Sequence, residues 1–376
     1  MSAEPVRVLH VVVAGEMGGA ERMLLDLARH PVETGAEHAI ALMTPVETVE
    51  RAFAQSGARV HRAPRSGDHA AAYLWRSLGP TSVTWLSGVI ERERAELVHL
   101  HTFGSQVLGT RAALRTKIAV LRTEHSSRVY TTPSCWPFSR WSLAQSHAVI
   151  AISDYLRRTM VAKAPGVAPR LWVIGNGVDT RRFAPASDPR PRVGPFRFVL
   201  VARLEPRKGV DLALEALALV PRAHLAIVGD GAERTRLERR SKDLGLGDRV
   251  RFRGYLDDPR SAMREADAAL SSSTDEGLGL GLLECMAAGL PAVGVPVGGI
   301  PEIVRDGVTG WLAAERSTAA LARAMREAAS DVDRARELGA TARRFVVQGH
   351  SVEAMARAYG LIYAKLAHRS KVEGAR

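Results

Sequence analysis

The feature that most constrains this fold is a regular alternation of short apolar runs with helical segments. Val6–Ala14 is a nearly continuous apolar run that ends at Gly15, which is typical of a strand buried on both faces. Apolar residues at helical spacing follow in Ala20–Arg29. Further strands are expected at 38–43, 97–101, 118–122, 148–152 and 171–174, with helices between them that include 81–94 and 155–162. This order predicts a parallel sheet with helices on both faces.

The same pattern restarts after residues 183–196, which are rich in proline and small residues and are expected to link two domains. Strands are expected at 198–201, 225–228, 250–253, 268–271 and 292–295, helices at 210–219, 233–244, 261–266 and 280–288, and further helix from 318 onward. The length of 376 residues also favours two domains. We therefore predict an α/β chain of two Rossmann-like, doubly wound domains, residues 1–183 and 184–351, that face each other across a cleft.

The chain is basic, with a net charge of +12 and a pI near 10.3, which favours phosphates, nucleic acid or an anionic membrane surface as partners. Because the basic residues are spread along the chain and form no long block of like charge, a nucleic-acid-binding arm is not expected. Two isolated cysteines, Cys135 and Cys285, exclude a disulfide framework and favour a reducing, cytoplasmic compartment. Met1–Pro5 lacks the features of a signal peptide, so none is expected.

Residues Gly277–Ile300 are long and apolar enough to suggest a membrane span, and Glu284 is their single charge. Seven glycines, two prolines and a carboxylate within the stretch argue against a lipid environment. We expect a buried loop, helix and strand there instead.

The most informative motif lies in the same stretch. Glu276 and Glu284 flank a glycine-rich loop, GLGLGLL, that opens a predicted helix. Glycine lets the backbone approach a ligand, and the first N–H groups of a helix can donate to hydroxyls or phosphate. Carboxylates only accept hydrogen bonds, so they suit the paired hydroxyls of a sugar or a ribose. The alternative is a plain glycine-rich turn before a buried helix, with Glu284 on a solvated face.

This segment resembles the E-x7-E signature of glycosyltransferase family 4, retaining enzymes of the GT-B fold that include bacterial glycan and polysaccharide types. The resemblance implies that Glu276 contacts the donor sugar and that Glu284 holds the ribose hydroxyls. It also implies backbone contacts to the sugar and phosphates from Gly277, Leu278, Gly279 and Leu280. Leu278 replaces the family's usual aromatic residue, which changes the expected shape of the sugar pocket.

The resemblance extends to the domains. It implies that residues 184–351 bind the nucleotide sugar and that residues 1–183 bind the acceptor. It further implies that a last helix, about 352–376, packs back on the first domain.

Two other motifs of the second half follow the family's order. Arg203 and Lys208, in RLEPRKG, resemble its R-x4-K-G turn and would bind the donor's pyrophosphate. The turn VGDG, which contains Gly229, resembles a turn of the family. The segment GYLDD, which contains Leu256, resembles the family's stretch that contacts the base. For Arg203 and Lys208 the alternative is a basic surface turn. For Gly229 it is an ordinary turn between strand and helix, and for the acidic pair of GYLDD it is a helix cap.

Matches in the first half are less specific. His125, in RTEHS, follows a strand where the family places a histidine near the transferred sugar, and His101 ends the preceding strand and would face the acceptor. Gly18 and Gly19, in GEMGGAE, resemble the acceptor-side glycine loop. For the two histidines the alternative is a purely structural role, and for the glycine pair it is a plain strand-to-helix turn.

The resemblance implies retaining transfer of a hexosyl group from a nucleotide-diphosphate sugar to a glycan, lipid-linked or small-molecule hydroxyl. Uracil is the commonest base in the family, so a UDP-sugar is the expected donor, with GDP and ADP as the alternative nucleotides. The catalytic residues would be His125, Glu276, Arg203 and Lys208, and domain closure would exclude water. No cofactor or metal is expected, because the one Asp-x-Asp, Asp331–Asp333, fits a solvated helix face.

We expect a cytoplasmic protein without a nucleic-acid partner. Peripheral contact with the inner face of an anionic membrane stays open, and the aromatic and basic residues Tyr73–Arg76, Trp85 and Leu86 could provide it. The favoured interpretation is that these residues belong to an ordinary core and surface. A nicotinamide dehydrogenase would need G-x-G-x-x-G after the first strand, which Gly15–Gly19 does not provide. A GT-B epimerase or inverting transferase disagrees with the paired motifs, and a non-catalytic sugar-nucleotide or membrane-surface binding module stays open.

Overall fold

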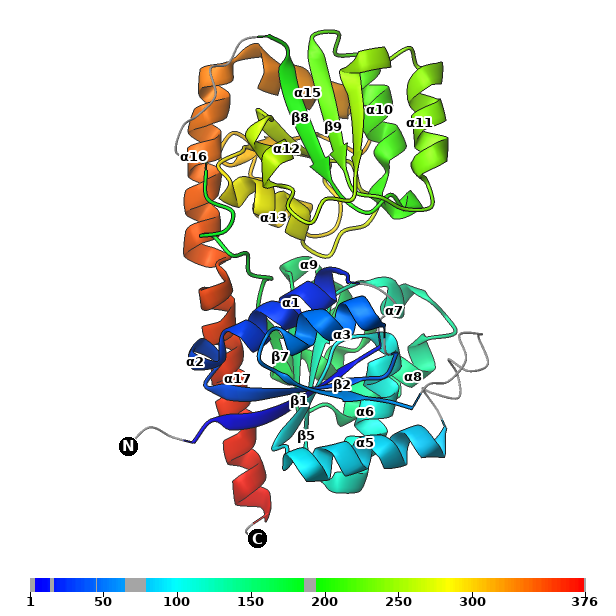
Figure 1. Ribbon diagram of the computed structural model, residues 1–376, viewed down its shortest axis with the longest axis vertical. Coiled ribbons are helices and arrows are strands. Elements are labelled where there is room, and N and C mark those ends of the chain that lie inside the picture. The colour runs from blue at the N-terminus through cyan, green and yellow to red at the C-terminus, as the bar shows by residue number, and fades with distance from the viewer. Residues whose placement is uncertain (1–3, 14–16, 45, 65–78, 186–193, 375–376) are drawn as a thin grey trace. The chain divides into compact units, whose positions relative to one another are not determined.

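The computed structural model describes residues 4–13, 17–44, 46–64, 79–185 and 194–374. Its contacts divide the chain into two units, Met1–Gly177 together with Val352–Arg376, and Val178–Ser351. Each unit is built on one parallel sheet flanked by helices (Figure 1). This confirms the predicted fold class of two parallel α/β domains.

The first unit contains a seven-stranded parallel sheet in the order β3-β2-β1-β4-β5-β6-β7. Its strands are β1 (Val6–Val12), β2 (Ala36–Leu42), β3 (Arg59–Arg62), β4 (Leu97–Leu100), β5 (Ala119–Glu124), β6 (Ala148–Ala151) and β7 (Leu171–Val173). Its described helices are α1 (Gly19–Arg29), α2 (Pro31–Thr34), α3 (Glu47–Ala54), α5 (Pro80–Glu93), α6 (Phe103–Thr116), α7 (Arg128–Thr131), α8 (Trp136–Gln145), α9 (Asp154–Lys163) and α17 (Val352–Gly374).

Strand β1 shows why the chain begins with a continuous apolar run. It pairs with β2 on one side and β4 on the other, so it is central to the sheet. Val8 packs into a core with residues of α1 and α17, whereas Leu9 packs on the opposite face with Leu86 of α5 and Leu108 of α6. Because successive side chains of a strand point to opposite faces, both sets of positions must be apolar.

The second unit contains a six-stranded parallel sheet in the order β10-β9-β8-β11-β12-β13, which is the doubly wound order. Its strands are β8 (Phe196–Val201), β9 (Ala223–Val228), β10 (Val250–Gly254), β11 (Ala268–Ser271), β12 (Ala292–Gly294) and β13 (Gly310–Leu312). Its described helices are α10 (Val210–Ala218), α11 (Arg234–Asp243), α12 (Arg260–Arg264), α13 (Leu280–Ala287), α14 (Ile300–Ile303), α15 (Thr318–Ser330) and α16 (Val332–Gly349).

The boundary between the units differs from the prediction. Residues 178–183, expected in the first domain, lie in the second unit. The backbone N–H of Val178 donates to the carbonyl of His350, and a guanidinium nitrogen of Arg343 lies 3.3 Å from the carbonyl oxygen of Phe183. Most of the expected linker, residues 186–193, falls outside the described residues. Helix α17 lies in the first unit and contributes Tyr359 and Tyr363 to its core.

The long apolar stretch 277–300 forms a loop, α13 and β12, which confirms the prediction of a buried loop, helix and strand. Within the described ranges, no helix has both the length and the apolar character that crossing a bilayer requires. Leu86 is fully buried, and the partly buried Trp85 packs against the same core. Tyr73–Arg76 lies outside the described residues.

Candidate functional site

The predicted donor residues follow the carboxyl ends of four neighbouring strands of the second unit, β10, β9, β8 and β11. Parallel strands end at the same edge of a sheet, which is where such sheets bind ligands. Hydrogen bonds tie the loops together: Leu204 N–H donates to the carbonyl of Asp230, and Thr274 N–H to that of Arg207. The Ser272 hydroxyl donates to the carbonyl of Lys208 at 3.3 Å. The sequence motifs therefore meet in one place within this unit.

Lys208 and Glu276 form the centre of this arrangement. Lys208 Nζ lies 2.5 Å from Glu276 Oε2, and both side chains are largely shielded from solvent. The Ser273 hydroxyl donates to the same oxygen at 3.3 Å. A charge-assisted bond of this kind orients both groups at once. The structure therefore brings together an ammonium and a carboxylate that lie 68 residues apart in the chain.

Two glycines hold the backbone of Glu276 in place. Gly299 N–H donates to the Glu276 carbonyl at 2.9 Å. Gly298 has φ of +56°, and a Cβ at this position would lie 1.9 Å from the Glu276 carbonyl oxygen. Only glycine fits such a close approach in a left-handed conformation. The pair of glycines that follows β12 therefore determines where the first acid of the motif lies.

Helix α13 begins directly after the glycine-rich loop. Gly279 precedes the helix with φ of +99°, and its carbonyl accepts from the N–H groups of Leu282 and Leu283. Gly281 lets the first turn approach β8, because a Cβ there would lie 2.6 Å from the carbonyl oxygen of Val201. The side chain of Leu278 is buried.

The second acid, Glu284, is buried on α13, with 5% of its surface exposed. A solvated helix face, the alternative for this residue, is thus wrong. Burial raises the pKa of the adjacent Cys285 thiol, and the charge of Glu284 raises it further. A carboxylate is expensive to bury unless it is paired or hydrogen-bonded.

Arg203 lies in the turn after β8 and is about 40% exposed. Its guanidinium lies 3.1 Å from Glu205 Oε1, and Arg207 donates to Glu205 Oε2 at 2.8 Å. Burial alone would raise the pKa of Glu205, but the hydrogen bond from Arg207 and the charges of Arg203 and Lys208 lower it overall. The turn is therefore a cationic cluster held by one internal carboxylate, which the motif comparison did not identify.

Gly229 and Leu256 lie at the neighbouring strand ends. Gly229 has φ of +138°, and a Cβ there would lie 1.9 Å from the carbonyl oxygen of Ala202, so glycine is required for the two loops to approach. Leu256 is half-buried beside the exposed Tyr255. Asp258 accepts from the backbone N–H of Arg260 and pairs with its guanidinium at 2.7 Å, so it acts as a turn residue.

In the first unit, His101 follows β4 and His125 follows the adjacent strand β5. Their rings lie 5.8 Å apart between centroids, so the structure brings these two predicted residues together. Neither ring nitrogen of His125 has a hydrogen-bond partner among the described residues, although both atoms are buried. Burial lowers the pKa of His125 to about 4, which keeps the ring neutral.

A buried ion pair supports the segment before His125. The guanidinium of Arg122 contacts the carboxylate of Glu124, and both side chains are almost completely buried. Arg122 also donates to the hydroxyl of Ser139 at 2.6 Å, and the Gln106 amide donates to Glu124 at 3.1 Å. In the sequence these residues stand out only as neighbours of His125. The sequence signal for this ion pair is an Arg and a Glu two residues apart in an apolar strand.

The described part of the acceptor-side glycine loop begins at residue 17. Gly18 precedes α1, and its backbone N–H donates to the carboxylate of Glu21 at 3.0 Å. A Cβ on Gly19 would meet no atom within 4 Å, so this position borders open space. Gly18 therefore fixes the start of the helix, whereas Gly19 is accessible. Gly15 and Glu16 lie outside the described residues.

His101 is also part of a buried histidine cluster that sequence reasoning missed. Its other members are His10 on β1, His38 on β2 and His99 on β4. Among the described residues, the one group of three metal-ligating side chains within mutual reach is His10, His99 and His101. Their nitrogens hydrogen-bond to one another and to neighbouring side chains, so the geometry is that of a hydrogen-bonded cluster.

Asp331 and Asp333 have structural functions. Asp331 accepts from the N–H of Arg334 at the start of α16, and Asp333 pairs with Arg336 at 2.8 Å. Both interactions are typical of a helix start.

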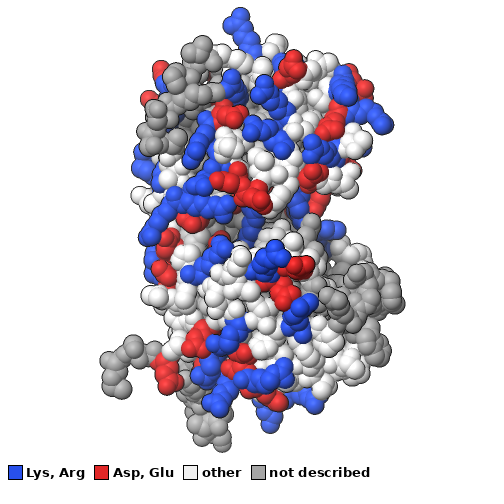
Figure 2. Space-filling model, viewed as in Figure 1, with Lys and Arg blue, Asp and Glu red and all other residues white. Residues whose placement is uncertain are grey.

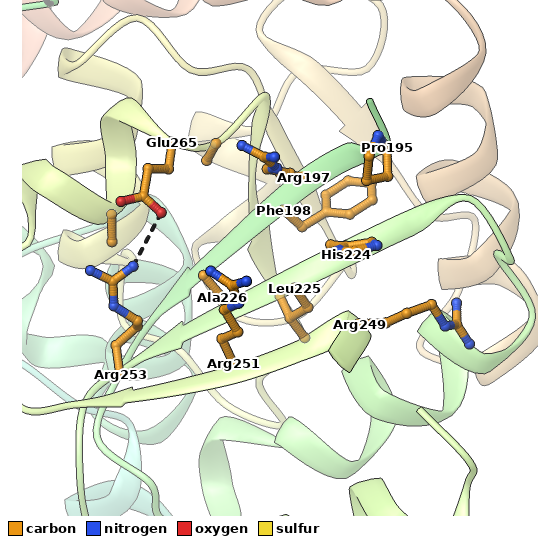
Figure 3. Close-up of a pocket in the computed structure, with 12 residues that line it drawn as sticks. Pro195, Arg197, Phe198, His224, Leu225, Ala226, Arg249, Arg251, Arg253 and Glu265 are labelled. Carbon is orange, nitrogen blue, oxygen red and sulfur yellow. Dashed lines mark hydrogen bonds and ion pairs between the residues drawn. The ribbon is translucent and has the colours of Figure 1, made fainter. Parts of the chain in front are cut away.

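A hollow of about 220 Å³ lies on the same sheet, near the beginnings of β8, β9 and β10. Figure 3 shows Arg197, Arg251 and His224 around it, and Arg253 paired with Glu265. It therefore lies away from the carboxyl-end loops that hold Lys208. On the face drawn in Figure 2, Lys and Arg are interspersed with Asp and Glu.

Two family models match the chain. Residues 17–182 match the model described as Glycosyltransferase Family 4, and residues 186–345 match Glycosyl transferases group 1. Together the two matches span both units and include every predicted site residue.

Curated relatives agree with this match. The chain is 30% identical over 301 residues to a putative glycosyltransferase, EpsD, of Bacillus subtilis, which covers 73% of this chain and 78% of that protein. It is 34% identical over 230 residues to a glycogen synthase of Mycobacterium tuberculosis, which covers 59% of this chain and 55% of that enzyme. The chain thus spans about half of the second relative.

A solved structure of Anabaena HepE, in complex with UDP and glucose, has a similar fold. The TM-score is 0.82, the identity is 22%, and the match covers 96% of this chain and 100% of that one.

Proposed function

The chain belongs to glycosyltransferase family 4 and is a transferase that uses sugar-nucleotide donors, and we propose that it transfers a hexosyl group from a UDP-sugar with retention of anomeric configuration. The acceptor class is a hydroxyl of a glycan, a lipid-linked glycan or a small molecule. The observation that carries the proposal is the Lys208–Glu276 pair at the carboxyl ends of β8 and β11, next to the start of α13.

In this proposal the donor binds to the second unit. Arg203 and Lys208 bind the pyrophosphate, because Arg and Lys donate several charge-assisted hydrogen bonds to phosphate oxygens. Glu276 orients the sugar, and Glu284 accepts from the ribose hydroxyls. The backbone of residues 277–280 lines the sugar and phosphates, and Gly229 and Leu256 border the base.

The reaction exchanges one bond at the anomeric carbon. The bond to the phosphate oxygen breaks as the acceptor oxygen attacks from the same face, and the departing phosphate takes the acceptor's proton. Arg203 and Lys208 stabilise the charge that develops on the leaving diphosphate. Since two side-chain cations supply this stabilisation, we propose that no metal or other cofactor is required.

The first unit would supply the acceptor side. His125 hydrogen-bonds the transferred sugar, and its neutral ring offers one donor and one acceptor. His101 and the accessible backbone at Gly18–Gly19 face the acceptor. Closure of the two units would exclude water from the reacting groups.

Uracil is proposed as the base on the strength of the HepE structure, which holds UDP. The paired motifs support a retaining transferase over an epimerase or an inverting enzyme. The isolated cysteines support a cytoplasmic site of action, and the basic charge supports peripheral contact with an anionic membrane surface that carries the acceptor.

A binding screen followed by an activity assay tests the proposal. Thermal shifts with UDP-, GDP- and ADP-sugars identify the donor, because a ligand at 100 times its Kd stabilises by about 2.7 kcal/mol. The selected donor is then used in hydrolysis and transfer assays, and proton NMR of the product reports the anomeric configuration. We expect a UDP-sugar to give the largest shift and the product to retain the donor's configuration.

Variants make the test specific to the site. Glu276→Ala and Lys208→Ala should lose transfer by at least about a hundredfold. Arg251→Gln removes a cation from the hollow near the beginnings of β8, β9 and β10, and is the matched control, with unchanged transfer. Binding without hydrolysis or transfer would identify a binding module, an inverted product would exclude the retaining mechanism, and full activity of Lys208→Ala would exclude the site.

A further inference from the structure

We propose that Thr34, His38 and His10 form a hydrogen-bonded chain that fixes the tautomer of His101, so that His101 Nδ1 is held as an acceptor for a substrate hydroxyl. His10 and His38 are thus positioning residues that act through His101. The tautomer follows from this unit alone, whereas the identity of the hydroxyl rests on the proposed function.

The chain is continuous and buried. Thr34 Oγ1 lies 2.9 Å from His38 Nε2, His38 Nδ1 lies 2.8 Å from His10 Nε2, and His10 Nδ1 lies 3.0 Å from His101 Nε2. None of the four residues exposes more than 5% of its surface. The three rings come from β1, β2 and the end of β4, which are neighbours in the sheet.

Burial keeps the three rings neutral. It lowers the pKa of His38 to about 4, and it holds the pKa values of His10 and His101 well below the ordinary range. A neutral imidazole has one N–H donor and one lone-pair acceptor. In a series of such rings, the direction of one hydrogen bond therefore sets the direction of all the others.

Thr34 sets that direction. Its hydroxyl lies 3.2 Å from the carbonyl oxygens of His30 and Pro31 and donates its single hydrogen there. Its oxygen can then only accept from His38 Nε2–H. His38 Nδ1 must accept from His10 Nε2–H, and His10 Nδ1 must accept from His101 Nε2–H. The remaining nitrogen, His101 Nδ1, carries the lone pair.

The far end of the chain is sealed by α17. A Cβ on Gly360 would lie 2.6 Å from the carbonyl oxygen of Thr34, so glycine allows the helix to pack directly on this residue. Thr34 is 2% exposed. Because water is excluded from Thr34, the carbonyl bonds of its hydroxyl decide the polarity of the chain.

The near end offers an acceptor to a ligand. His101 Nδ1 is buried and has no hydrogen-bond partner among the described residues, and the His101 ring lies 5.8 Å from that of His125. A buried acceptor left unpaired costs free energy, which a hydroxyl donor would recover. The chemical class is a neutral polyol, such as a sugar, because a lone pair repels an anion.

His99 lies beside the hydrogen-bonded chain but is not part of it. Its Nδ1 bonds to the hydroxyl of Tyr363 and its Nε2 to that of Thr123, at 3.0 and 2.8 Å. Thr123 therefore provides a matched control for Thr34. Both are buried threonines whose hydroxyl meets a histidine nitrogen of the same cluster.

The first experiment determines the tautomer of His101 in the full-length protein without substrate. Long-range ¹H–¹⁵N NMR of ¹⁵N-histidine protein distinguishes a protonated from a bare ring nitrogen. We expect His101 in the Nε2–H form in the wild type and in Thr34→Ser, which keeps the hydroxyl. Thr34→Val should give a mixture of both forms, whereas Thr123→Val should leave His101 unchanged.

The second experiment measures steady-state kinetics with the donor and acceptor that support transfer. Thr34→Val should raise the KM for the acceptor about fivefold to tenfold, the value of one lost hydrogen bond, with the donor KM unchanged. Thr34→Ser should restore it. If Thr34→Val does not fold, His10→Gln replaces it and should likewise mix the tautomers.

Either of two results overturns the proposal: His101 protonated at Nδ1 in the wild type, or an unchanged tautomer in both Thr34→Val and His10→Gln. The NMR result does not depend on any activity. Inactivity of the wild type with every sugar nucleotide would therefore refute the proposed function and leave the histidine chain standing.

Discussion

Lys208 Nζ lies 2.5 Å from Glu276 Oε2, so the two side chains assigned to the donor's pyrophosphate and sugar are bonded to each other. This contact makes the two residues a single unit. Each one orients the other, and removal of either leaves its partner charged and poorly solvated.

The first prediction follows from that coupling. Lys208→Ala and Glu276→Ala should each lower kcat/KM by at least about a hundredfold, and the double variant should lose little more than either one. The measurement is a double-mutant cycle on kcat/KM for the donor. Strictly additive losses would show that the two side chains act independently.

The second prediction concerns the backbone beneath Glu276. Gly298→Ala should lower kcat by at least about tenfold, because its Cβ would lie 1.9 Å from the Glu276 carbonyl oxygen and must displace it. Gly307→Ala is the matched control, since Gly307 also has a positive φ, +67°, but no atom within 4 Å of a Cβ. In both variants, backbone strain at the positive φ should lower the free energy of unfolding by about 1 kcal/mol. Equal activity of the two would contradict the assigned position of Glu276.

The third prediction concerns the buried Arg122–Glu124 pair. Arg122→Met should lower the free energy of unfolding by about 3–5 kcal/mol, because it leaves the Glu124 charge buried and unpaired. Arg122→Met combined with Glu124→Leu should recover most of that loss. Urea unfolding measures both variants, and a double variant no more stable than the single one would show that packing, rather than charge, dominates here.

The fourth prediction is a loss of stability in mild acid. Burial lowers the pKa of His38 from 6.5 to about 4, so between these values the unfolded chain binds more protons than the folded one. Stability should therefore fall as the pH drops from about 6.5 to 4, by about 3 kcal/mol for His38 alone. His10, His99 and His101 shift in the same direction.

Urea midpoints at several pH values test this dependence. His38→Gln should make the curve less steep between pH 6.5 and 4, because the other three histidines still contribute. The carboxylates with lowered pKa values, such as Glu205, lose their contribution only at lower pH, below their ordinary value of 4.5. A wild-type midpoint that stays constant down to pH 5 would contradict the buried, neutral state of the histidines.

The sequence predicted the parts of the fold that depend on local pattern. Buried parallel strands such as β1 and β8 must be apolar on both faces, so their runs stand out. Strand β3, with the sequence RVHR, lies at the sheet edge and was missed because an edge strand need not be apolar. Strand β13 has only three residues, too few for a pattern.

The site was predicted as a set of motifs, and the contacts within it were not. Lys208 and Glu276 each match a motif, but their bond depends on how the loops after β8 and β11 fold toward each other. The histidine chain is less visible still. His10, His38 and His101 are isolated in sequence, and only the order of β1, β2 and β4 makes them neighbours.

Helix α17 has a consequence for how the protein matures during synthesis. The first unit needs Tyr359 and Tyr363, which reach the ribosome exit after the entire second unit. Until residues 178–351 have been translated, the part of the first sheet's apolar core that α17 covers therefore stays uncovered. A segment that is made after the second unit thus completes the core of the first unit.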